Sequence, residues 1–128
     1  MDVVPHIARC LDVPVYMAEM KGKPLNQELY YAKSKEDDEV EDLYNLLVMV
    51  KEKHPEIQAV ASGAIFSNYQ RLRVENICSR LGLMSLSYLW LREQGPLLQE
   101  MIDHGLHAEI VKVCCMGLKP VHLGKTIA

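Results

Sequence analysis

The sequence lacks the patterns that would send a protein to a membrane or out of the cell. No apolar run approaches the roughly 20 residues that span a bilayer. The opening residues, Met1–His6, lack the basic and apolar regions of a secretory signal. We therefore expect a cytoplasmic chain with no membrane partner.

Positive charge is also not in excess. Fourteen Lys and Arg against seventeen Asp and Glu leave a formal net charge of −3. Proteins that bind nucleic acid or anionic lipid present a basic surface, so we expect no nucleic-acid partner. A length of 128 residues with 49% hydrophobic residues is sufficient for one domain with one core.

Cysteine is sparse, and its spacing excludes the common zinc motifs. The four cysteines are Cys10, Cys78, Cys114 and Cys115, and none forms a Cys-x-x-Cys pair. We expect reduced, mostly buried thiols, with Cys114 and Cys115 packed as small hydrophobic residues. No Gly-x-Gly-x-x-Gly, Walker A, Gly-x-Ser-x-Gly or His-Glu-x-x-His motif occurs either. Because none of these motifs is present, they indicate no activity for this sequence.

What the sequence does have is a regular alternation of strand and helix patterns. Apolar runs predict short strands, at 13–17, 57–61, 85–89 and 107–115. Helical periodicity with capping residues predicts helices, at 3–11, 40–54, 68–81 and 96–104. Between them, 21–35 reads as a long loop. The alternation predicts an α/β domain with a Rossmann-like parallel sheet.

Six of the seven residues from Glu36 to Asp42 are acidic. Asp38 and Glu41 have the spacing of a helix capping box, and the cluster complements the positive end of a helix dipole. Glu39 and Glu41 stay open to a second role, because they follow a strand and its loop, where a metal or a cationic substrate would be held.

Ligands of parallel sheets bind beyond the carboxyl ends of the strands, where this sequence concentrates glycine, polar and aromatic residues. Gly63 and Ser67 suit a nucleotide and its phosphate, or are an ordinary strand exit and N-cap. Tyr69, Gln70 and Arg73 have helical spacing that would bring them to a phosphate or an adenine. The alternative is a solvated Arg73, or one in a salt bridge.

Trp90, the only tryptophan, follows another predicted strand. A tryptophan at a strand end covers a core more often than it stacks on a ligand.

Several blocks of residues, in order along the chain, resemble the diphthine–ammonia ligase family. They are Asp38-Glu39-Val40-Glu41-Asp42-Leu43-Tyr44, Gly63-Ala64-Ile65, Ser67-x-Tyr69-Gln70-Arg71-x-Arg73-Val74-Glu75-Asn76, Tyr88-Leu89-Trp90, Gly117-Leu118 and His122-Leu123-Gly124-Lys125-Thr126. The blocks span nearly the whole chain, and the Tyr-Gln-Arg-x-Arg-Val-Glu block is specific.

The resemblance implies an ATP pyrophosphatase fold of the adenine nucleotide alpha-hydrolase type. It implies that ATP, with Mg²⁺, adenylates the diphthine carboxylate of translation elongation factor 2, and that ammonium supplies the nitrogen of the amide. Site residues follow by position. Arg73 and Glu75 are expected to be catalytic, Gly63, Ser67, Tyr69 and Gln70 to bind the nucleotide, and Glu39, Glu41 and Trp90 to contact substrate. In a complete enzyme, we expect Arg73→Ala to reduce turnover severely and leave the fold intact.

The chain also departs from the family pattern. It contains neither the Ser-Gly-Gly-Lys-Asp-Ser pyrophosphate loop nor the Gly-Glu-Gly-Gly-Glu-Tyr block. We therefore expect residues 1–128 to be a single, incomplete ATP pyrophosphatase-like domain, a fragment that is inactive alone because the loop's phosphate-binding amides are missing. The alternative is a noncatalytic remnant of the fold that binds a nucleotide or a protein.

Overall fold

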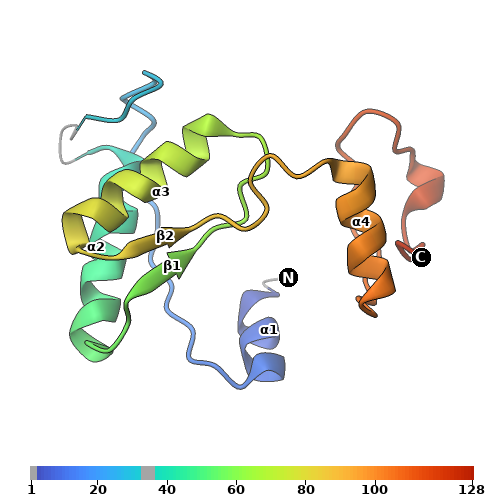
Figure 1. The fold of residues 1–128 in the computed structure, drawn as a ribbon, viewed down its shortest axis with the longest axis horizontal. Helices are drawn as coiled ribbons and strands as arrows, with labels where there is room; N and C mark the ends of the chain where they lie inside the picture. Colours follow the sequence, from blue (N-terminus) through green and yellow to red (C-terminus); the bar gives the residue numbers. More distant parts are fainter. Residues whose placement is uncertain (1–2, 33–36) are drawn as a thin grey trace. The chain divides into compact units, whose positions relative to one another are not determined.

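Four α-helices and one pair of strands form the described part of the chain, residues 3–32 and 37–128 of this computed structural model (Figure 1). The elements in order are α1 (Val4–Leu11), α2 (Glu39–Lys53), β1 (Ala59–Ala61), α3 (Asn68–Leu81), β2 (Met84–Leu86), α4 (Gln94–Asp103) and a 3₁₀ turn (Pro120–His122). The chain divides into two compact units, Met1–Trp90 and Leu91–Ala128. The candidate site lies in the first unit.

β1 and β2 are parallel neighbours joined by α3, which confirms the expected α/β class. Val60 pairs with Ser85 at the centre of the register. The predicted caps of α3 are confirmed: Ser67 accepts a hydrogen bond from the Gln70 N–H at the N-terminus, and Gly82 ends the helix with φ 64°. A left-handed C-terminal residue favours glycine, which has no Cβ to clash.

The core of the first unit lies where α2 and α3 pack together. Ile77 is fully buried, and it clusters with Val40 and Tyr31. Tyr44, Leu47 and Leu81 cover this cluster from the same two helices. Because α3 also packs on β2, the two helices and the strand pair hold one another in place.

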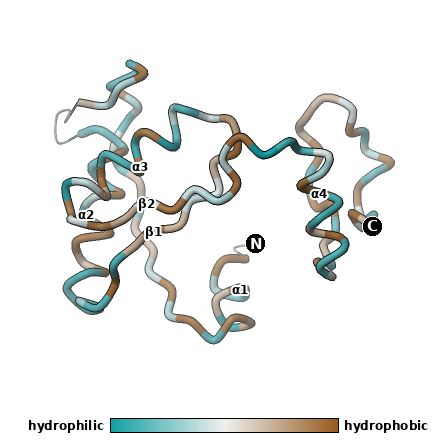
Figure 2. Tube along the Cα trace, in the orientation of Figure 1, coloured by the Kyte–Doolittle hydropathy of each residue, from teal (hydrophilic) through white to brown (hydrophobic). Residues whose placement is uncertain are grey.

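Two predicted strands do not form. Residues 13–17 and 107–115 contain no strand, although hydrophobic residues occur along both (Figure 2). Val13, Met17 and Val111 are exposed, and only an isolated bridge links Glu109 to Thr126. A strand is stabilised by hydrogen bonds to a neighbouring strand. Neither segment pairs with β1 or β2, so the sheet of the described residues is smaller than the alternation predicted.

The expectation of mostly buried thiols was wrong. All four cysteines are free, but Cys10, Cys114 and Cys115 are exposed, and only Cys78 is buried. Cys114 and Cys115 are exposed because their segment does not enter a sheet. Burial raises the pKa of the Cys78 thiol, which packs as a core residue on α3.

The second unit consists of α4 and the segment that follows it. α4 begins two residues before the predicted Pro96 and ends before Gly105, whose φ of 79° stops the helix as predicted. In the described ranges of both units, no helix is long and apolar enough to cross a membrane.

A loop of residues 21–32 is anchored to the start of α2 and is called the 21–32 loop below. Asp42 accepts hydrogen bonds from the backbone N–H groups of Lys21 and Gly22, both at 2.7 Å. These bonds, Gly22 first, lower the pKa of the Asp42 carboxyl. A Cβ on Gly22 would lie 2.5 Å from backbone atoms of Asp38 and Glu39, so only glycine permits this approach.

Candidate functional site

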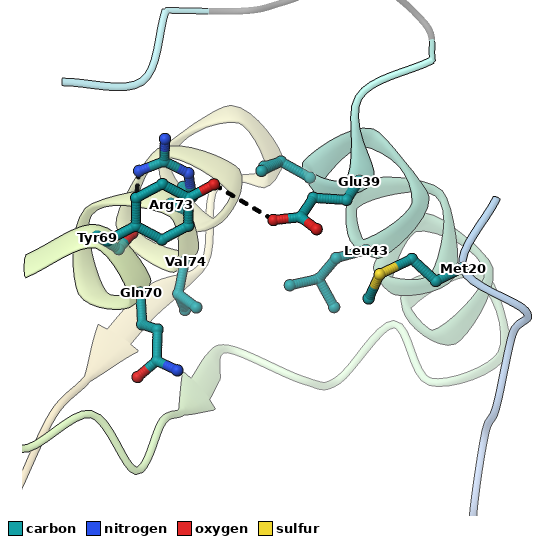
Figure 3. Close-up of a pocket in the computed structure, with 8 residues that line it drawn as sticks. Met20, Glu39, Leu43, Tyr69, Gln70, Arg73 and Val74 are labelled. Carbon is teal, nitrogen blue, oxygen red and sulfur yellow. Dashed lines mark hydrogen bonds between the residues drawn. The ribbon is translucent and has the colours of Figure 1, made fainter. Parts of the chain in front are cut away.

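A cavity of about 340 Å³ opens between α2, α3 and the segment that precedes the 21–32 loop (Figure 3). It is lined by Met20, Glu39, Val40, Leu43, Tyr69, Gln70, Arg73 and Val74. Four of these were predicted from the sequence as site residues: Glu39, Tyr69, Gln70 and Arg73. The fold therefore brings together residues that lie about thirty positions apart, from two of the predicted blocks.

Tyr69 links the two helices across this cavity. Its hydroxyl donates a hydrogen bond to Oε1 of Glu39 at 3.3 Å, drawn as a dashed line in Figure 3. Its ring stacks on the Arg73 guanidinium, whose Cζ lies 3.2 Å from the ring centroid. The Gln70 side chain points away from this stack and is exposed. The cavity is thus lined by the carboxylate of Glu39, the hydroxyl of Tyr69 and the amide of Gln70, next to apolar side chains.

Arg73 is buried, and no acid in residues 3–32 and 37–128 lies within salt-bridge distance of it, so both alternatives from the sequence, a solvated Arg73 and a salt-bridged one, are corrected. Its guanidinium donates to three backbone carbonyl oxygens, at 2.5 Å to Asn26, 3.2 Å to Glu28 and 3.1 Å to Tyr69. The first two lie in the 21–32 loop. Arg73 therefore fixes that loop to α3 as well as lining the cavity.

Asp38 fixes the same loop to α2. The carboxylate is 1% exposed, and Oδ1 accepts the N–H of Val40, the predicted N-cap interaction, and the hydroxyl of Tyr31. Oδ2 accepts the N–H of Asn26 at 3.0 Å. The Tyr31 hydroxyl shares its single proton between Asp38 Oδ1 and Oε1 of Glu41, at 3.1 and 3.0 Å. Every one of these bonds offsets the cost of burying a charge.

Glu41 forms the second half of this buried network. Arg80 donates to both of its oxygens, at 2.9 and 2.7 Å, in a bidentate pair. The Arg80 guanidinium also lies 3.9 Å from the ring centroid of Tyr44. Glu41 does not line the cavity, so its geometry is that of a structural ion pair.

The other predicted site residues lie outside the cavity lining. Gly63 is exposed with open space around it, and the Ser67 hydroxyl caps α3. Glu75 pairs with Arg71 at 2.5 Å. Trp90 is half-buried beneath the Arg71 guanidinium, 4.5 Å from Cζ to the ring centroid. These residues follow β1 and β2, on the side of the strands where ligands of parallel sheets bind.

The carboxylates of the described ranges do not form a metal cage. Across residues 3–32 and 37–128, no group of three or more His, Cys, Asp or Glu side chains is arranged to hold a metal ion. Mg²⁺ bound to nucleotide phosphates needs only one or two protein carboxylates. Among the described residues, Glu39 is the only carboxylate that lines the cavity, so the residues present do not form a site for a resident ion.

The sequence did not indicate the residues that support this site from distant positions in the chain. Tyr31 sits in a stretch without periodicity, and its partners Asp38 and Glu41 gave only a capping signal. Arg80 lies 39 residues from Glu41, beyond any local pattern. Met20 and Leu43 are apolar residues with nothing in the sequence to mark them as cavity walls.

These features define an α/β domain with parallel strands and a cavity beside its helices. Comparison with known proteins assigns the family. Residues 6–85, more than half of the chain, match the family model described as the diphthamide synthase N-terminal domain. The chain belongs to this family, as its blocks of residues predicted.

Relatives with an assigned name match across nearly the whole chain. A diphthine–ammonia ligase of Schizosaccharomyces pombe is 49% identical over 127 residues, covering 99% of this chain and 21% of the relative. The Homo sapiens protein of the same name is 50% identical over 121 residues, covering 94% of this chain and 45% of the relative. The Saccharomyces cerevisiae protein is 40% identical over 142 residues. The chain thus spans less than half the length of these relatives.

Arg73 gives the first test of this geometry. We predict that Arg73→Ala lowers the free energy of unfolding by about 1–3 kcal/mol, because the buried guanidinium and its hydrogen bonds to three backbone carbonyl oxygens are lost. The same measurement tests the expectation that the fold of this variant stays intact. Arg73→Lys should restore less than half of the lost free energy of unfolding, because one ammonium group cannot donate to three carbonyl oxygens and also stack on Tyr69. Urea denaturation measures both; Arg71→Ala, on the same helix, should change stability by less than about 1 kcal/mol. An equal loss in both alanine variants would contradict this role.

Tyr31 gives a test by pH. Burial first, then the Glu41 and Asp38 carboxylates, raises the pKa of Tyr31 well above its usual value near 10. The unfolded chain therefore loses this proton at lower pH than the folded chain does. The resulting stability is fully present below about pH 10 and falls above it, by up to about 1.4 kcal/mol per pH unit.

Denaturation between pH 8 and 11 would measure this slope. Tyr31→Phe should remove this part of the alkaline loss, whereas Tyr30→Phe, which changes a phenol on an exposed residue, should leave it unchanged. An unaltered slope in Tyr31→Phe would show that the Tyr31 proton is not held by the fold.

Proposed function

We propose that the chain is part of a diphthine–ammonia ligase, which uses ATP and ammonium to amidate diphthine on translation elongation factor 2. The observation that carries this proposal is the 49–50% identity to relatives of that name over 94–99% of the chain. Convergence of Glu39, Tyr69, Gln70 and Arg73 on one cavity supports it. The activity belongs to a full-length protein, because the chain spans less than half of those relatives.

The proposed reaction has two steps. A diphthine carboxylate oxygen attacks the α-phosphorus of ATP, and pyrophosphate leaves. Ammonia then attacks the acyl carbon, and AMP leaves as the amide forms. Negative charge develops on phosphate and acyl oxygens in these steps, so hydrogen-bond donors near them lower the barrier. Mg²⁺ arriving with ATP would neutralise part of the phosphate charge.

Within this reaction the two groups of site residues have different proposed tasks. Gly63, Ser67 and the start of α3 lie beyond β1, where a nucleotide approaches a parallel sheet. Glu39 and Tyr69 face the cavity, where a part of the substrate would bind. The structural bonds of Arg73 leave it a positioning role, through Tyr69 and the 21–32 loop.

A chimera tests the proposal. The matching stretch of the S. pombe ligase is replaced by this chain, and the chimera is expressed in cells that lack their own ligase. Mass spectrometry of the elongation factor 2 peptide then measures diphthine and diphthamide. We predict that the chimera produces diphthamide. Gln70→Ala in the chimera should lower the yield without changing stability, because this exposed side chain lines the cavity.

Diphthine without diphthamide, from a chimera expressed at the level of the unaltered S. pombe protein, would contradict the ligase assignment. It would favour a noncatalytic member of the family that binds a nucleotide or a protein.

A further inference from the structure

Glu39 is an acid that borders the cavity, and no Lys, Arg or His of the described ranges lies within salt-bridge distance of it. Its Oε1 accepts one hydrogen bond from Tyr69 at 3.3 Å, and in the described ranges neither oxygen has a salt-bridge partner. The neighbouring acids differ, because Glu41 is paired with Arg80 and Asp42 binds backbone N–H groups. Among the described acids of this cluster, Glu39 is therefore the one that lines this cavity and has no salt-bridge partner.

The hydrogen-bond donors of Arg73 and of the start of α2 are already used by the protein. The Arg73 guanidinium donates to three carbonyl oxygens and is stacked on Tyr69. At the start of α2, the N–H groups of the first three residues also have acceptors: Lys23 O for Glu39, Asp38 Oδ1 for Val40 and Asp38 O for Glu41. A helix N-terminus attracts anions through free N–H groups. At the start of α2 these groups are occupied, so the side of the cavity where Glu39 lies offers an anion no free N–H donor.

The walls of the cavity specify which kind of cation. Met20, Leu43 and Val74 are apolar, and Figure 3 shows Met20 and Leu43 on the α2 side of the space that Val74 and Tyr69 close from α3. A metal ion or a primary ammonium would lose strong hydration there without enough oxygen ligands in return. A cation covered by methyl groups gains from apolar and aromatic contact and needs only one counter-charge.

We propose that this cavity binds a quaternary ammonium group, with the Glu39 carboxylate as its counter-charge and Tyr69 holding that carboxylate in place. The inference rests on the proposed function, because diphthine carries a trimethylammonium group near the carboxyl that is amidated. It extends that function by assigning substrate recognition to α2 and α3, apart from the nucleotide region beyond β1.

The experiment uses the full 128-residue chain and tetramethylammonium chloride as the probe. Two-dimensional amide NMR follows a titration at constant ionic strength. We expect saturable shifts at Glu39, Tyr69 and Gln70, and no such shifts with tert-butyl alcohol, a neutral molecule of similar size. Glu39→Gln should weaken binding by about tenfold, since the charge is lost and the shape is kept. Glu52→Gln, an exposed acid on the same helix, should bind as the unaltered chain does.

Other outcomes overturn the proposal. Equal shifts with the neutral molecule, or unchanged affinity in Glu39→Gln, would show that Glu39 is not the counter-charge. This result would hold whether or not the proposed function is correct. Titrations with sodium phosphate and with magnesium chloride test the other ligands. If one of these salts shifts the same residues and tetramethylammonium does not, the cavity binds phosphate or a metal ion. The titration contains no ATP, ammonia or elongation factor, so its failure beside an active chimera would leave the ligase assignment standing.

Discussion

The buried carboxylate of Asp38 is the interaction on which the rest of the site depends. A charge that is 1% exposed is tolerated only when hydrogen bonds replace its water. Donors from three places meet it: the start of α2, Tyr31 and the backbone of Asn26. Because the last two belong to the 21–32 loop, satisfying the carboxylate also fixes the loop. Arg73 then joins the loop to α3 through two of its carbonyl oxygens.

The acids around Asp38 show how helix geometry separates their tasks. Successive residues of a helix point about 100° apart, so a run of acids cannot face one way. Asp38 points inward, Glu39 borders the cavity, Glu41 pairs with Arg80, and Asp42 binds the backbone of Lys21 and Gly22. A cluster that complements a helix dipole thereby also builds a core, anchors a loop and places one carboxylate, that of Glu39, at the cavity.

The sequence predicted what local patterns determine. Periodicity and capping residues located α2 and α3, including Asp38, Ser67 and Gly82, and the alternation of elements predicted a parallel pair. It failed where structure depends on distant partners. The segment 13–17 has a strand's composition and no strand to pair with, and Arg73 bonds residues 45 and 47 positions away. For the same reason, the sequence could predict individual residues of the cavity but not the full set that lines it.

Native-state hydrogen exchange of the 21–32 loop tests this account most directly. The amide protons of Gly22, Lys23 and Asn26 donate to Asp42, Asp37 and Asp38. If the buried carboxylate holds the loop as an integral part of the fold, these amides exchange only with the opening that also frees the amides of α2 and α3. Exchange at the rate of an unfolded peptide, while the helices stay protected, would contradict it.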